Sequence, residues 1–348
     1  MLDNKELGNK ILNEKDRLAK EILDQQYQEN PLLWEKWGQQ GYDRCLEDTA
    51  YHLSYLAESI KTGSPAVFHN YIKWARELFE NLGIPTEDLS RNLILIQEIV
   101  SSNIPEAENL ISERIDKAMD MIESDYIPEM TYIDTSKPLG NAATEYLNRL
   151  LYGKRSIAVK YILDLVNSGI NIKDVYIHIF QPTQYEVGRL WQTGKISVAQ
   201  EHYATAVTQM AMSQLYSKIF ETPKIGKNMI ATCPSGELHE IGVRMLADIF
   251  ELSGWDTYYL GANTPESGIL STIEKEKPDL IAISAAMTYH LSKVENLINY
   301  IRKSNYPDIK ILVGGYVFKS VTDLWKEVGA DGFAPDAIKA LELVNNMN

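Results

Sequence analysis

Short apolar runs alternate with amphipathic segments in the last third of the chain. Apolar residues recur at helical spacing after the first run, on one face formed by Ile241, Met245, Leu246, Ile249 and Leu252. Strands that alternate with helices in this way form parallel sheets. We therefore predict a doubly wound, Rossmann-like (flavodoxin-like) domain over residues 224–348, with buried strands at residues 229–232, 257–260, 280–284 and 310–313.

The first 126 residues follow a helical period and predict an N-terminal helical bundle. Helices are expected at about residues 5–28 and 42–60. Three more are expected after Ser64-Pro65, Pro85 and Pro105, because serine suits the N-cap and proline the first turn. His52 and His69 are interpreted as structural residues rather than haem ligands. The aromatic side chains are interpreted as bundle core, namely Trp34, Trp37, Tyr51, Tyr55, Phe68, Tyr71, Trp74 and Phe79.

A linker and a second helical block lie between these two parts. Residues 127–141 contain Pro128, Pro138 and Gly140 and no helical period, which indicates a linker. Residues 142–223 predict a cap of four helices, at about 145–151, 156–168, 175–191 and 197–219, separated by Gly153, Gly169 and Gly194. The expected class is a multidomain α and α/β protein.

Charge is concentrated in the first part of the chain and argues against nucleic-acid binding. Residues 1–130 contain 13 Lys and Arg against 25 Asp and Glu, about −12 of the total net charge of −14. Phosphate contacts require the opposite sign, and we find no helix-turn-helix with a basic recognition helix. We expect no nucleic-acid partner.

Membrane and disulfide features are also missing from the sequence. No apolar run approaches the ~20 residues of a membrane helix, and residues 1–5 do not begin a signal peptide. Cys45 and Cys233 are the two cysteines, which fits a reducing compartment, and Cys233 is interpreted as a small core residue. We expect a cytoplasmic protein without a membrane partner.

A histidine follows the first predicted strand, in the sequence Cys-Pro-Ser-Gly-Glu-Leu-His-Glu-Ile-Gly at residues 233–242. Doubly wound sheets bind ligands at the carboxyl ends of their strands, where this segment falls. Glu237 can accept a hydrogen bond from one nitrogen of His239, which fixes the tautomer and leaves the other nitrogen free for a metal. Gly242 removes a side chain where a large ligand must pass.

This segment resembles the cobalamin-binding domain, whose motif is an acidic residue, any residue, His, two residues and Gly. The resemblance implies that His239 is the lower axial ligand of cobalt. It also implies that Ser284 and Gly314-Gly315, after the third and fourth strands, line a slot for the nucleotide tail. The usual Leu two residues after this Ser is Ala286 here. His290 is expected to take no part in binding. Cofactor contacts are further expected from Glu237, Leu238, Glu240, Ile241 and Gly242.

The cap carries a second motif, in which Trp191 is followed after ten residues by Glu201-His202. This spacing resembles the cap of adenosylcobalamin-dependent photoreceptors, the light-responsive regulators of carotenoid synthesis genes. The resemblance implies that these residues and Val198 enclose the adenosyl group. An indole excludes water from the cobalt–carbon bond, and Glu201 can accept hydrogen bonds from ribose hydroxyls. Some family members have a His after the Trp, where this chain has Gln192, so His202 is the nearest candidate for a new upper ligand after photolysis.

The resemblance covers residues 142–348 and predicts an adenosylcobalamin-binding sensor without enzymatic turnover, switched by light or by the upper ligand. Because the bundle replaces the family's DNA-binding domain, we expect it to act on an unknown protein partner or to change self-association in a homo-oligomer. Two alternatives remain: a corrinoid shuttle protein for methyl transfer, and the cobalamin-binding subunit of a radical mutase. A lid over a nucleoside argues against the shuttle, and the missing barrel domain argues against the mutase.

Overall fold

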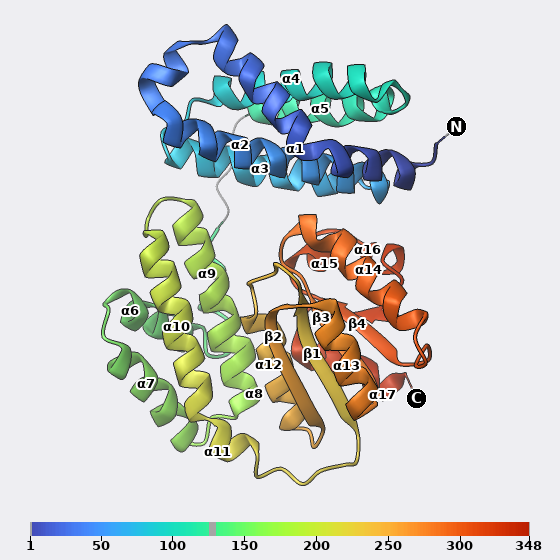
Figure 1. Ribbon diagram of the computed structural model, residues 1–348. Coiled ribbons are helices and arrows are strands. Elements are labelled where there is room, and N and C mark those ends of the chain that lie inside the picture. Colours follow the sequence, from blue (N-terminus) through green and yellow to red (C-terminus); the bar gives the residue numbers. More distant parts are fainter. Residues whose placement is uncertain (1, 125–129, 348) are drawn as a thin grey trace. The chain divides into compact units, whose positions relative to one another are not determined.

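The computed structural model describes residues 2–124 and 130–347 and contains two compact units, residues 1–127 and 128–348 (Figure 1). Residues 127–129 of the predicted linker, including Pro128, lie outside the described residues. Among the described residues, no helix is long and apolar enough to cross a membrane.

The first unit is helical, as predicted. Its helices are α1 (Asn4–Glu29), α2 (Leu32–Lys61), α3 (Pro65–Asn81), α4 (Thr86–Asn103), the short η1 (Pro105–Ala107) and α5 (Glu108–Glu123). Helix α2 starts ten residues before the predicted residue 42, because the chain stays helical on both sides of a kink at Gly38, where φ is 59°. Ser64 stands at the N-cap of α3, but its side chain makes no capping hydrogen bond.

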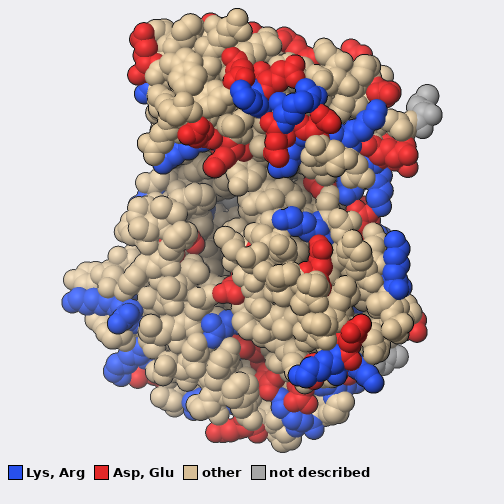
Figure 2. Space-filling view, in the orientation of Figure 1, with Lys and Arg blue, Asp and Glu red and all other residues tan. Residues whose placement is uncertain are grey.

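The core of the first unit contains only some of the predicted aromatic residues. Phe68 and Tyr71 are buried, and the Tyr71 hydroxyl bonds Nδ1 of the buried His52 at 2.7 Å. Trp34 and Tyr51 are each 42% exposed, so their assignment to the core is wrong. Trp34 instead stacks on Tyr42 near the surface. Figure 2 shows acidic side chains among Lys and Arg over this unit, with no continuous basic stripe on the face shown.

The second unit begins with the cap. Its helices are α6 (Gly140–Leu151), α7 (Arg155–Asn167), α8 (Ile172–Val175), the π-helical η2 (Tyr176–Phe180), α9 (Gln181–Gln192), α10 (Val198–Gln214) and α11 (Tyr216–Ile219). The third predicted helix, 175–191, thus corresponds to the last residue of α8, the π-helical η2 and α9, which follow one another without a break. Gly153, Gly169 and Gly194 have φ between 65° and 103° and end the preceding helices. Ser197 and Gln200 form a capping box at α10.

A parallel sheet follows, which confirms the predicted fold class. Its strands are β1 (Asn228–Pro234), β2 (Asp256–Thr264), β3 (Leu280–Ser284), β4 (Lys310–Gly314) and β5 (Gly332–Phe333), in the order β2-β1-β3-β4-β5. The sequence did not predict β5. The accompanying helices are α12 (Ile241–Glu251), α13 (Glu266–Glu276), η3 (Thr288–His290), α14 (Leu291–Arg302), α15 (Tyr316–Ser320), α16 (Leu324–Glu327) and α17 (Ala337–Asn346).

The cap and the sheet are joined by a common hydrophobic core. Met245 and Ile249 of α12 and Ala337 of α17 belong to the same buried cluster as the cap residues. Polar contacts cross the same boundary, because the Tyr176 hydroxyl donates to Asp248 at 2.8 Å. Burial raises the pKa of Asp248 to about 6. The cap is therefore fixed on α12, the helix that follows the loop after β1.

Candidate functional site

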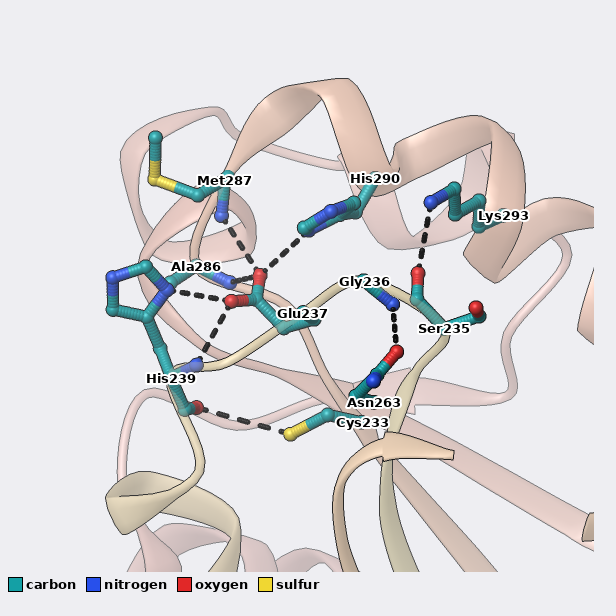
Figure 3. A network of polar contacts seen from close by, with 10 residues as sticks. All are labelled: Cys233, Ser235, Gly236, Glu237, His239, Asn263, Ala286, Met287, His290 and Lys293. Carbon is teal, nitrogen blue, oxygen red and sulfur yellow. Dashed lines mark hydrogen bonds and ion pairs between the residues drawn. The ribbon is translucent and has the colours of Figure 1, made fainter. Parts of the chain in front are cut away.

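The loop that connects β1 to α12 carries His239 and is fastened to its neighbours. Gly236 has a φ of 85°, and its N–H donates to Oδ1 of Asn263 at 2.7 Å. The Lys293 ammonium donates to the carbonyl oxygen of Ser235 at 2.9 Å. Figure 3 shows both contacts beside the buried Glu237. The loop is therefore held by the end of β2 and by α14 before any ligand binds.

Glu237 is the centre of the polar network in this loop. Its Oε1 accepts from the backbone N–H of His239 at 3.0 Å and from Nδ1 of the same residue at 2.5 Å. Its Oε2 accepts from the N–H groups of Ala286 and Met287 and from Nδ1 of His290, at 2.8, 3.1 and 2.9 Å. A fully buried carboxylate is tolerated only when hydrogen bonds of this kind compensate for the lost water.

The predicted hydrogen bond between Glu237 and His239 is therefore confirmed, and it leaves one ring nitrogen for a metal. With Nδ1 bonded to the carboxylate, Nε2 of His239 is the nitrogen that remains for coordination, and no described residue is recorded as bonding it. The His239 side chain is 61% exposed, whereas Glu237 is buried. A buried carboxylate behind an exposed imidazole is the usual support of a metal-binding histidine.

The electrostatics of the pair follow from these contacts. Burial opposes ionisation of Glu237, but the hydrogen bonds from His239 and His290 outweigh it, so the pKa of Glu237 lies well below its ordinary value. The hydrogen bond to Glu237 raises the pKa of His239, burial opposes the rise, and the charges of Glu237 and Glu201 add to it. Glu201 belongs to the cap, so the cap brings a carboxylate within electrostatic reach of His239.

The neighbours of His239 differ in their availability to a ligand. Leu238 is exposed, and a Cβ placed on Gly242 would meet no atom within 4 Å. Ile241 opens α12 and packs against the cap core. The Glu240 carboxylate is already engaged, because it accepts from Gln209 of α10 and from Tyr259 of β2, both at 2.8 Å. Glu240, one of the residues predicted to contact the cofactor, therefore connects the cap to the sheet through its carboxylate.

The predicted slot lies at the ends of β3 and β4. Ser284 is buried and pairs with Gly314 in the sheet register. Gly315 has a φ of 97°, and a Cβ there would lie 2.2 Å from the carbonyl oxygen of Ala285. Glycine at position 315 is thus required by the protein backbone itself. Gly314 leaves space, because a Cβ placed there would lie 3.8 Å from the carbonyl oxygen of Ala334.

The cap residues lie around the turn between α9 and α10. Trp191 is in the last turn of α9 and packs partly buried against the cap core. Glu201 accepts from Thr205 at 3.1 Å and contacts Nδ1 of His202 at 2.5 Å. Val198 is 51% exposed and the His202 side chain 74%. The side chains of Val198 and His202 are therefore accessible to solvent in this structure.

His290, which the sequence analysis set aside, is the residue that reasoning from sequence missed. The sequence predicts no part in binding for this residue, but it is buried and bonds the same carboxylate as His239, so it belongs to the polar network of the site. The available signal was its place just after β3, because the carboxyl ends of parallel strands meet at one edge of the sheet. Asn263, near the end of β2, and Lys293, in the helix after β3, could have been found in the same way.

Comparison with known families identifies the class of both parts of the second unit. The B12 binding domain family matches residues 226–342, and a second B12 binding domain family matches residues 142–216. B12-binding domains are therefore present, and they indicate a cobalamin or related corrinoid cofactor. The phycobilisome protein family matches residues 6–124.

Individual relatives are found among corrinoid proteins and a repressor. A corrinoid protein of Desulfitobacterium hafniense is 27% identical over 193 residues, 53% of this chain and 83% of that protein. The HTH-type transcriptional repressor CarA of Myxococcus xanthus is 32% identical over 90 residues, 26% of this chain and 31% of that protein. The structure of the monomethylamine corrinoid protein of Methanosarcina barkeri has the same fold, with a TM-score of 0.54 at 19% identity, over 61% of this chain and all of that one.

The described residues fit such a cofactor. A corrinoid needs a nitrogen ligand for cobalt and space beside it. His239 offers a supported imidazole, and the positions of Gly242 and Gly314 leave open space near the same strand ends. No cluster of three or more His, Cys, Asp or Glu side chains among the described residues could hold a bare metal ion. A single protein ligand suits a metal whose remaining ligands come with the cofactor.

Proposed function

We propose that this chain is a corrinoid carrier, in which His239 binds the cobalt and the upper face of the cofactor is presented to a separate methyltransferase. The observation that carries the proposal is the supported, exposed imidazole of His239, which lies within the region that matches one B12 binding domain family and follows the region that matches the other. A corrinoid supplies a cobalt ion whose upper ligand can be a methyl or an adenosyl group. The protein itself binds, orients and exposes that group, without being the enzyme that transfers it.

The relatives favour the carrier over the light-responsive sensor that the sequence predicts. Those named as corrinoid proteins match most of their own length, whereas the match to CarA covers about a third of that protein. The exposed side chains of Val198 and His202 are also consistent with an upper face that a partner can reach. The carrier is therefore the better supported of the two uses.

An adenosylcobalamin-dependent sensor is the second candidate, and specific observations favour it. Trp191 and the hydrogen-bonded pair Glu201 and His202 retain the spacing of the photoreceptor cap. The aligned segment of CarA is shorter, but its sequence identity to this chain, 32%, is higher than the 27% of the Desulfitobacterium protein. Residues 6–124 match a family named after a light-harvesting assembly. This candidate keeps the adenosyl form as the cofactor and light as the signal.

Relative affinity for different cobalamins separates the two candidates. We would measure binding of methylcobalamin, adenosylcobalamin and hydroxocobalamin to the full chain in darkness by absorbance titration. A carrier is expected to bind methylcobalamin at least as tightly as adenosylcobalamin. A sensor is expected to prefer the adenosyl form, and the preference should disappear in Trp191→Ala and Glu201→Ala and fall in part in His202→Ala.

The control variant is Glu145→Ala, which removes an exposed carboxylate from α6 in the same cap. It should leave the relative affinities unchanged. An adenosyl preference that survives Trp191→Ala and Glu201→Ala would contradict the role of the cap, and no binding of any cobalamin would contradict both candidates.

A further inference from the structure

Two histidines share one buried carboxylate at the candidate site. Figure 3 shows Glu237 between the imidazoles of His239 and His290, each bonded through Nδ1 to a different carboxylate oxygen. The two differ in exposure, because the His290 side chain is 2% exposed and that of His239 is 61% exposed. The exposed His239 ring is accessible to a ligand, whereas the buried His290 ring contacts Glu237 behind it.

His290 is itself held in place by its surroundings. It closes η3 and stands at the N-cap of α14, and its ring packs edge-on against Tyr289. A Cβ on Gly236 would lie 3.3 Å from Nε2 of His290, so this ring fills the space beside the turn that leads to Glu237. The ring therefore joins the loop after β3 to the loop after β1.

We propose that His290 is a positioning residue for the metal ligand: it fixes the second oxygen of Glu237 and thereby the tautomer and ring direction of His239. This inference rests on the proposed corrinoid role of His239. It adds a residue that neither the sequence motif nor the family matches assign.

The physical reason lies in how a carboxylate is held. The N–H groups of Ala286 and Met287 come from adjacent residues, so they fix Oε2 from one segment of backbone. His290 adds a third donor to Oε2, from a ring that packs beside Gly236 in the loop after β1. This additional bond restrains rotation of the carboxylate plane. Without it, a cavity beside Glu237 would admit water, and Oε1 would hold the Nδ1 proton of His239 less tightly.

The first test uses the protein without cofactor. Nitrogen-15 NMR of the histidine side chains, recorded at alkaline pH where His239 is neutral, reports which ring nitrogen carries the proton. The wild type is expected to show His239 protonated at Nδ1. His290→Leu should shift the population toward Nε2, and His290→Asn, whose amide donates from nearly the same place as Nδ1, should restore it.

Lys303→Met is the control, because Lys303 is an exposed residue at the C-cap of α14, at the other end of the helix from His290. It should leave the His239 tautomer unchanged. A tautomer that is unchanged in His290→Leu, or changed equally in Lys303→Met, would overturn the inference. Thermal unfolding of each variant shows whether a change reflects the loop or loss of the fold.

The second test measures hydroxocobalamin binding. His290→Leu should weaken binding about 10-fold, the lower end of the effect of losing an outer partner of a metal ligand, and His290→Asn should recover most of the loss. If the wild type binds no cobalamin, the proposed function fails while the NMR result still decides the role of His290. Unchanged affinity in His290→Leu would refute a contribution of His290 to cofactor binding.

Discussion

His52 links the stability of the first unit to pH at the scale of a single residue. Burial lowers its pKa to about 3 from the ordinary value of 6.5, although Tyr71 bonds its Nδ1. Below pH 6.5 the unfolded chain binds a proton at this position, whereas the folded chain does so only near pH 3. The free energy of unfolding therefore decreases as pH falls through this window.

The first prediction is that His52→Gln reduces this pH dependence. The histidine should contribute a loss of up to about 1.4 kcal/mol per pH unit between roughly pH 6 and 4. Asp48 acts in the opposite direction, because burial raises its pKa to about 6. The informative quantity is therefore the difference in slope between wild type and variant in urea unfolding of the full chain. Equal slopes would contradict the assignment.

Glu240 shows how one side chain couples two elements. Its Oε1 accepts from Gln209 of α10, and its Oε2 accepts from the Tyr259 hydroxyl and from the N–H of Ala262, both in β2. The cap helix that carries Glu201 is thereby tied to the sheet next to His239. Because these donors are partly buried, removing the carboxylate leaves them without this partner.

We predict that Glu240→Ala destabilises the second unit by about 1–3 kcal/mol and loosens α10. Hydrogen exchange should increase over residues 198–214 more than over α6 and α7, because the donor Gln209 belongs to α10. Glu266→Ala, in the first turn of α13, is the control and should change neither. If hydrogen exchange in α10 of Glu240→Ala equals that of the wild type, Glu240 does not hold α10 on the sheet.

The elements that the sequence predicts well are those set by local pattern. β3 is buried along its whole length and has the predicted bounds, and α10 begins next to residue 197, where the fourth cap helix is predicted to start. β5 has two residues and no pattern of its own, and η2 is a distortion within an otherwise ordinary helical period. The Glu237–His239 contact is likewise local. The contact of His290 with Glu237 spans 53 residues and exists only after the sheet has formed.

At the scale of the whole molecule, charge divides the chain. The first unit carries most of the negative charge, whereas residues 131–348 are close to neutral. Its match to the phycobilisome protein family and its helical fold leave a protein partner, or a second copy of the chain, as the proposed target. A polyanion would meet long-range repulsion.

We predict that the full chain does not bind duplex DNA at ~0.15 M salt, because the acidic first unit lacks the excess of Lys and Arg that phosphate contacts require. Fluorescence anisotropy with an arbitrary labelled duplex tests this. Salt-sensitive DNA binding would contradict the charge argument.

In the sensor alternative, light scattering after size exclusion should show a different association state of the adenosylcobalamin-loaded chain after illumination. Identical masses in darkness and light would favour the carrier.

The measurement that tests the central claim most directly is the identity of the nitrogen bound to cobalt. Electron paramagnetic resonance of the reduced, cobalamin-loaded full chain reports the axial nitrogen through its hyperfine splitting. If His239 binds cobalt in place of the cobalamin's own base, labelling only histidine with nitrogen-15 should change that splitting. The label-dependent change in splitting should be lost and binding weakened in His239→Ala but not in His69→Ala, a histidine of the first unit. A splitting that ignores the label, or that persists in His239→Ala, would contradict the account.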